Sequence, residues 1–205
     1  MPYLFLLPAI FLNPWIWKIW GENWPAALAM LPITAAYFAI LLGGVRRIVA
    51  VSIITTLSLA CLTFFLAGPD LRLINPTPTE IWTVNQRRSL YPKPWGRLFQ
   101  NKAVLVLDKI IGNVYTALDP NLYFFSTHPR ERLGIPEFSK ISPWFLPVFL
   151  VGLFFWIRNF RKIYLFPLAL GLLLAAVSDP ASVSGPVAMF PWISSLIAWG
   201  LYKLI

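Results

Sequence analysis

One long polar segment divides an otherwise apolar chain and limits the folds that are open to it. Residues 69–142 hold six of the eight acidic residues, ten of the seventeen basic residues and the one histidine. The chain as a whole is 58% hydrophobic and 12% charged, with a mean hydropathy of +0.68. Soluble domains are about a quarter charged. The composition therefore predicts an all-α integral membrane protein whose recognition chemistry lies in residues 69–142.

The apolar runs predict about six transmembrane helices, since roughly 20 apolar residues cross the hydrocarbon core of a bilayer. Pro8 and Pro14 predict that the first run is kinked or broken, or else lies in the membrane as a re-entrant or interfacial segment. We expect three spans in residues 1–68, an outward-facing cap of short amphipathic helices in 69–142, and three spans in 143–205. The six runs are 2–20, 25–43, 48–67, 143–157, 163–178 and 187–202.

Lys18 falls on the outer side and is an exception, but the other six basic residues outside the polar segment predict the orientation of these spans. They lie in short links or near the end of the chain, where the positive-inside rule places them in the cytoplasm. We therefore expect a plasma (inner) membrane protein with both termini cytoplasmic and residues 69–142 extracytoplasmic. The residues concerned are Arg46, Arg47, Arg158, Arg161, Lys162 and Lys203.

Two helices are predicted within the polar segment. The sequence Thr77-Pro78-Thr79-Glu80 is typical of a capping box, so a helix should begin at Pro78 and end near Arg88. Apolar residues at helical spacing predict a second helix over residues 101–118, capped by Asn101. The cap should pack against the bundle through Trp82, Val104, Ile111, Val114 and Phe124.

The candidate binding residues also lie in this segment. His128, Arg130 and Arg132 form a cationic cluster, and the planar guanidinium of arginine suits phosphate oxygens. Asp108 and Asn113 lie on the polar side of the predicted second helix. They are further ligand-binding candidates, or else this helix only lies on the membrane surface or packs on the bundle. The alternative interpretation is a structural loop, in which Glu131 pairs with one of the arginines and the aromatic residues pack on the bundle.

Several classes of chemistry are not expected. The chain has no glycine-rich phosphate loop and no nucleotide-binding fingerprint. One histidine cannot supply the usual ligands of a zinc site, so we expect neither a metal nor another cofactor. The excess of basic residues belongs to the membrane context, where membrane lipids are the natural partners, and no nucleic acid is expected.

The order of motifs in this chain resembles the later part of the GT-C membrane glycosyltransferases, the family of protein mannosyltransferases and aminoarabinose transferases. The resemblance covers about residues 75–200. It rests on Asn101-Lys102, Asn113-Val114-Tyr115, the segments Leu118–Phe125, Arg130–Gly134 and Pro147–Leu153, and the link Asp179–Pro191. It implies a polyprenyl-phosphate sugar as ligand on the outer face of the membrane.

This family carries its catalytic carboxylate in the first outer loop, and here the chain departs from the pattern. The corresponding link, residues 18–24, has Glu22 as its only acidic residue. The chain thus resembles the C-terminal half of such an enzyme, and Met1 could be an internal methionine of a longer one. We expect a non-catalytic protein that binds a lipid-phosphate-linked sugar or pairs with a catalytic membrane subunit.

Two alternatives stay open. The first is an active or partner-completed glycosyltransferase that uses a polyprenyl-phosphate sugar through an atypical carboxylate such as Asp70 or Glu80. The second is a component of a transporter or channel. The absence of ionisable residues from the middle of the predicted spans counts against the second, because transport pathways commonly carry them.

Overall fold

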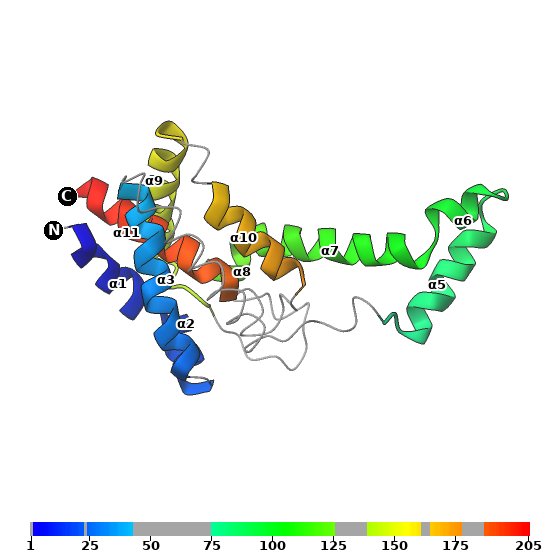
Figure 1. Cartoon of the computed structure of the whole chain (residues 1–205), viewed down its shortest axis with the longest axis horizontal. Helices are drawn as coiled ribbons and strands as arrows, with labels where there is room; N and C mark the ends of the chain where they lie inside the picture. The colour runs from blue at the N-terminus through cyan, green and yellow to red at the C-terminus, as the bar shows by residue number, and fades with distance from the viewer. Residues whose placement is uncertain (1, 23, 43–74, 126–138, 161–164, 178–186) are drawn as a thin grey trace.

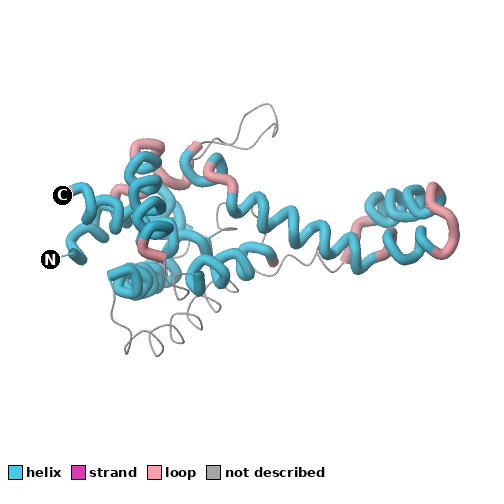
Figure 2. Tube along the Cα trace, turned by 90° about the horizontal axis from the view of Figure 1, so that it is seen from above, coloured by secondary structure: helices cyan, strands magenta, loops and turns pink. Residues whose placement is uncertain are grey.

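The computed structural model describes residues 2–22, 24–42, 75–125, 139–160, 165–177 and 187–205. Within these ranges every secondary-structure element is a helix, as the sequence predicts, and there is no strand. A bundle of helices holds both ends of the chain, and α7 extends from it as an arm with α5 and α6 at its far end (Figure 1). The same elongated shape is seen from above (Figure 2).

Helix α11 (Phe190–Leu204) is the centre of the bundle. It packs between α3 (Trp24–Leu42) and α9 (Phe145–Arg158), and every residue from Phe190 to Gly200 is buried. The short helix η3 (Val187–Met189) precedes it. Helices α9 and α11 approach closely at Gly152 and Gly200, where an added Cβ would strike the backbone of the opposite helix.

The N-terminal elements pack on this core. They are η1 (Pro2–Phe5), α1 (Leu6–Phe11) and α2 (Pro14–Glu22). The chain bends by 65° between α1 and α2, which confirms the break predicted at Pro14, whereas α1 continues through Pro8. The buried side chain of Asn13 accepts a hydrogen bond from the Trp15 backbone N–H at 3.0 Å, so it caps the start of α2.

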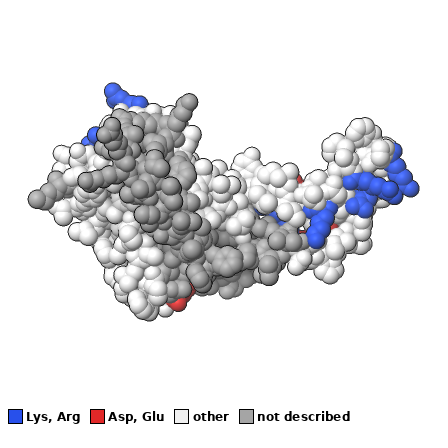
Figure 3. Space-filling model, in the orientation of Figure 1, with Lys and Arg blue, Asp and Glu red and all other residues white. Residues whose placement is uncertain are grey.

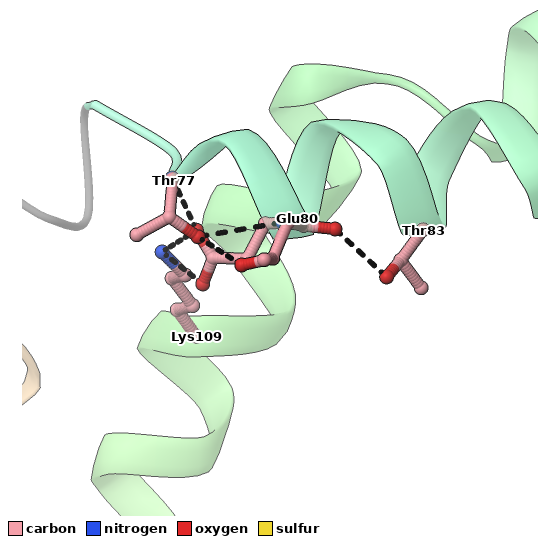
Figure 4. A network of polar contacts seen from close by, with 5 residues as sticks. Thr77, Glu80, Thr83 and Lys109 are labelled. Carbon is pink, nitrogen blue, oxygen red and sulfur yellow. Dashed lines mark hydrogen bonds and ion pairs between the residues drawn. The ribbon is translucent and has the colours of Figure 1, made fainter.

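The arm confirms both helices predicted in the polar segment. Helix α5 (Pro78–Ser89) begins with the complete capping box, and Glu80 also pairs with Lys109 of α7 at 2.9 Å (Figure 4). Helix α6 (Trp95–Phe99) follows a turn. Helix α7 (Lys102–Leu118) begins where the Asn101 side chain accepts the Val104 N–H at 2.9 Å, and the short helix α8 (Asn121–Phe124) leads back into the bundle.

The predicted packing of the cap against the bundle is wrong for most of the arm. The side chains of Trp82 and Ile111 are 63% and 42% exposed, whereas Phe124 is buried. The end of α7 nearest α8 packs against α10 (Leu165–Ala176), and α5 and α6 stand away from the bundle (Figures 1 and 2). An amphipathic helix is expected to bury its apolar face, but the spacing of its apolar residues does not show which partner covers that face.

The prediction of about six transmembrane helices is also wrong. One described helix, Val187–Leu204, is long and apolar enough to cross a membrane, or two if Pro2–Phe11 and Pro14–Glu22 form one bent span. The other apolar stretches are shorter: Ala27–Leu42 within α3, Phe145–Arg158 of α9, and Pro167–Ala176 within α10. At 1.5 Å per residue they reach about 15–24 Å, less than the roughly 30 Å of hydrocarbon. The predicted span 48–67 lies outside the described residues.

The physical reason for this error lies in what the apolar residues contact. The Val187–Leu204 helix is 78% buried inside the molecule, so its apolar side chains mainly form an intramolecular core. A run of apolar residues has the same composition whether its neighbours are lipid chains or other helices. Counting apolar runs shows neither these neighbours nor where each helix ends, so it overestimated the number of helices that are long enough to span a membrane.

Candidate functional site

An apolar cavity of about 200 Å³ lies where the arm joins the bundle. Its walls come from the end of α7, from α8, from α9, and from η3 and the start of α11. None of its lining residues is charged. They are Ala117, Leu118, Pro120, Tyr123, Phe124, Phe149, Leu153, Met189, Trp192 and Ile193.

The turn after α7 builds one wall of this pocket. The Asp119 carboxylate accepts the Asn121 backbone N–H at 2.9 Å, which stabilises the turn that the sequence Asp-Pro-Asn predicts. Helix α8 then buries Tyr123 and Phe124 in the bundle. The Tyr123 hydroxyl donates to the Ala117 carbonyl at 2.7 Å, and burial raises the pKa of that hydroxyl, so it stays protonated as a donor.

Aromatic rings from three elements surround the cavity. The Phe124 ring lies 5.4 Å from that of Phe149, and the Phe149 ring lies edge-on to Trp192 at 6.1 Å between centroids. Aromatic pairs in offset or edge-on arrangements contribute stability beyond the burial of their apolar area. The Trp192 indole N–H is buried and makes no hydrogen bond to the described residues. It is the one unsatisfied polar group among the residues that line the pocket.

A second set of contacts holds together the chain on either side of residues 126–138. The Ile141 N–H donates to the Tyr123 carbonyl at 2.7 Å, and the Trp15 N–H donates to the Lys140 carbonyl at 2.9 Å. The Trp15 and Tyr123 rings also lie 5.9 Å apart. Residues 123 and 141 are therefore fixed side by side next to the pocket, against the start of α2.

Sequence reasoning missed the pocket lining and it missed Lys140. Lys140 is 5% exposed and is the one charged side chain buried among the described residues. Burial of a charge costs free energy unless the charge is paired, so the burial of Lys140 indicates that its surroundings satisfy the charged group. The signal in the sequence was its place at the junction between the polar segment and the apolar run that begins at Pro143.

The predicted site residues are not brought together in the described part of the chain. Asp108 is exposed on α7, and Asn113 donates from its amide to the Ala176 carbonyl at the end of α10, at 2.9 Å. Neither residue lines the pocket. His128, Arg130 and Arg132 lie outside the described residues. No cluster of three or more His, Cys, Asp or Glu side chains suited to a metal ion occurs in the described ranges.

No protein-family model, curated protein or solved structure matches this chain. The resemblance to GT-C glycosyltransferases therefore remains a prediction from motifs alone. Because a fold does not determine an activity, we infer function from the pocket and from the chain beside it.

Proposed function

We propose that this chain is a non-catalytic, membrane-associated protein that binds a lipid-phosphate-linked sugar, with part of the lipid chain in the pocket between α7, α8, α9 and α11. The observation that carries the proposal is the apolar pocket itself, which has aromatic walls and no charged lining residue. Ligand pockets of this kind are mainly apolar, with a few polar groups that orient the ligand. The unsatisfied indole N–H of Trp192 is suited to that role.

The position of the cationic cluster in the chain supports a phosphate-bearing ligand. His128, Arg130 and Arg132 lie in the sequence between Phe125 and Ser139. The described chain on the two sides of that stretch is joined by the hydrogen bond from Ile141 to Tyr123, a pocket residue. A polyprenyl-phosphate sugar has an apolar chain for the pocket and a phosphate for arginine.

Binding without chemistry fits the residues of the pocket better than sugar transfer does. General acid–base or nucleophilic catalysis needs a titratable group within hydrogen-bond reach of the reacting atoms. The one titratable side chain among the lining residues is Tyr123. Burial raises its pKa, so the hydroxyl stays protonated and donates to the Ala117 carbonyl, and it is not available to accept a proton. A role beside a separate catalytic membrane subunit is compatible with this arrangement.

The test is the affinity of the purified chain for a polyprenyl-phosphate sugar. Leu153→Trp adds bulk to the pocket wall, and Leu150→Trp adds the same bulk on the exposed side of α9, where Leu150 is 52% exposed. We expect the first variant to weaken binding at least about tenfold and the second to leave it unchanged. Circular dichroism and thermal melting are used to check that both variants fold.

The phosphate half of the proposal is tested with arginine variants. Arg130→Ala and Arg132→Ala should each weaken binding about tenfold or more, since a charge-assisted pair is removed, whereas Arg158→Ala on the exposed end of α9 should not. Equal affinity in all these variants, or transfer of the sugar to an acceptor by the purified chain, would contradict the proposal.

A further inference from the structure

The far end of the arm carries basic and apolar side chains that nothing in the described chain covers. We define the arm tip as residues 87–100, which comprise the end of α5, the turn and α6. It lies farther from the chain ends than any other described element (Figures 1 and 2). The arm tip contributes no residue to the pocket, so a role for it is independent of the proposed function.

The arm tip is a preformed structure. The Arg88 guanidinium donates twice to the Gln100 carbonyl, from Nε at 3.0 Å and from Nη2 at 2.8 Å, and so ties the end of α5 to the end of α6. Gly96 lies so close to Arg88 that an added Cβ would be 2.6 Å from its carbonyl oxygen. A surface held in this way loses little conformational freedom when it binds.

The charge of the arm tip is positive and is not neutralised within it. Arg87, Lys93 and Arg97 are exposed, and the stretch 87–100 contains no acidic residue. The ion pair between Glu80 and Lys109 lies outside the arm tip. Basic side chains gather at this end of the molecule over α5 and α6 (Figure 3).

Large apolar side chains accompany these charges. Trp95, Leu98 and Phe99 are each more than half exposed, and their spacing places them on one face of α6. The Trp95 and Phe99 rings stack at 5.8 Å. Leu90 in the turn is 79% exposed. Exposed aliphatic side chains add little binding free energy when the partner is a hydrated polyanion, because they stay in water. They add binding free energy when the partner is a bilayer, because they are buried among acyl chains.

We propose that the arm tip docks on the surface of an anionic lipid bilayer. Arg87, Lys93 and Arg97 would meet anionic head groups, while Trp95, Leu98 and Phe99 enter the interface, where tryptophan is enriched. We propose a bilayer as the partner because the arm tip combines unneutralised positive charge with an exposed aromatic and aliphatic face. Through α7, the docked tip would hold the pocket at a fixed distance from that surface.

A fluorophore at Leu98 reports on this contact directly. In a Cys61→Ser background, Leu98→Cys provides a single site for an environment-sensitive label on the full chain. The labelled protein is mixed with phosphatidylcholine vesicles, or with vesicles of equal parts phosphatidylcholine and phosphatidylglycerol. We expect the emission of the label to shift to the blue with the anionic vesicles. Bromine-labelled acyl chains should quench this emission, and high salt should reverse the shift.

Charge-neutralising variants decide whether the arm tip is responsible. A surface lysine or arginine is worth about fivefold in affinity for an anionic membrane. Arg87→Gln, Lys93→Gln and Arg97→Gln together should therefore weaken binding by about a hundredfold. The control, Arg158→Gln with Lys203→Gln, removes two exposed charges from the bundle and should leave the label's response unchanged.

Three results would overturn the inference. The first is a label at position 98 that does not respond to anionic vesicles, and the second is an equal response to both kinds of vesicle. The third is an equal response of the triple variant and its control. The triple variant should bind the polyprenyl-phosphate sugar as the unmodified chain does. A loss of sugar-lipid binding through Leu153→Trp, with the label response intact, would therefore separate the two proposals.

Discussion

At the scale of single residues, Glu80 links the stability of the arm to pH. Its carboxylate accepts hydrogen bonds from the Lys109 ammonium at 3.0 Å and from the Thr77 backbone N–H at 2.8 Å. These contacts, with the lysine contributing most, hold the pKa of Glu80 below its usual value of 4.5. A carboxyl group whose pKa is lowered by folding stabilises the folded state fully only while it is ionised in both states.

We therefore expect the contribution of Glu80 to be complete above pH 4.5 and to disappear as the pH falls through the lowered pKa. Glu80→Gln keeps a side chain that can accept the Thr77 N–H, but it removes the charge. The variant should melt at a lower temperature than the unmodified chain at neutral pH, and the difference should vanish in acid. A difference that is constant with pH would contradict this expectation.

At the scale of elements, the approach of α9 to α11 depends on two glycines. A Cβ at Gly152 would collide with the backbone of Leu196, and one at Gly200 would collide with the backbone of Val148. Backbone cannot move aside as the end of a flexible side chain can. The two helices would have to separate, which would loosen the core around α11.

We expect Gly152→Ala and Gly200→Ala each to destabilise the protein by about 1–3 kcal/mol, the usual cost of overpacking. Gly112→Ala in α7 is the matched control, because nothing lies within 4 Å of its added Cβ. That substitution should stabilise the helix by about 0.5–1 kcal/mol. Thermal melting followed by circular dichroism compares the three variants, and equal effects at all three positions would show that helix propensity, not packing, governs α9 and α11.

Sequence reasoning succeeded for these elements where the signal is local. The cap at Thr77, the cap at Asn101 and the break at Pro14 each depend on residues within one turn, and all three are confirmed. It failed where the outcome depends on distant partners. The exposure of Trp82 and the bond from Asn113 to Ala176 could not be read from spacing, because both depend on where the arm lies relative to the bundle.

At the scale of the whole molecule, the same limit explains the pocket and the number of spans. The pocket draws on residues from Ala117 to Ile193, which no single motif contains. The apolar runs correctly placed most of the helices of the bundle. They could not show that α9 and α10 are too short to cross a bilayer, or that α11 is enclosed by its neighbours.

The attachment of the arm to the bundle rests in part on Asn113. Its amide donates to the Ala176 carbonyl at the end of α10, which is one of the last carbonyls of that helix and has no partner within it. Removal of the donor leaves a part-buried carbonyl without this bond, at a cost of about 1–3 kcal/mol. The lost hydrogen bond lies at the junction between α7 and α10, so its removal should favour local opening where the arm joins the bundle.

We expect Asn113→Ala to speed hydrogen exchange in α10 and in the last two turns of α7, while α3 and α11 keep their protection. Asn85→Ala is the control, since Asn85 is exposed on α5, away from the junction between α7 and α10. Exchange followed by mass spectrometry distinguishes the outcomes. Faster exchange throughout the bundle would mean that arm and bundle unfold as one unit, and unchanged exchange would mean that the apolar contacts between α7 and α10 are sufficient to hold the arm.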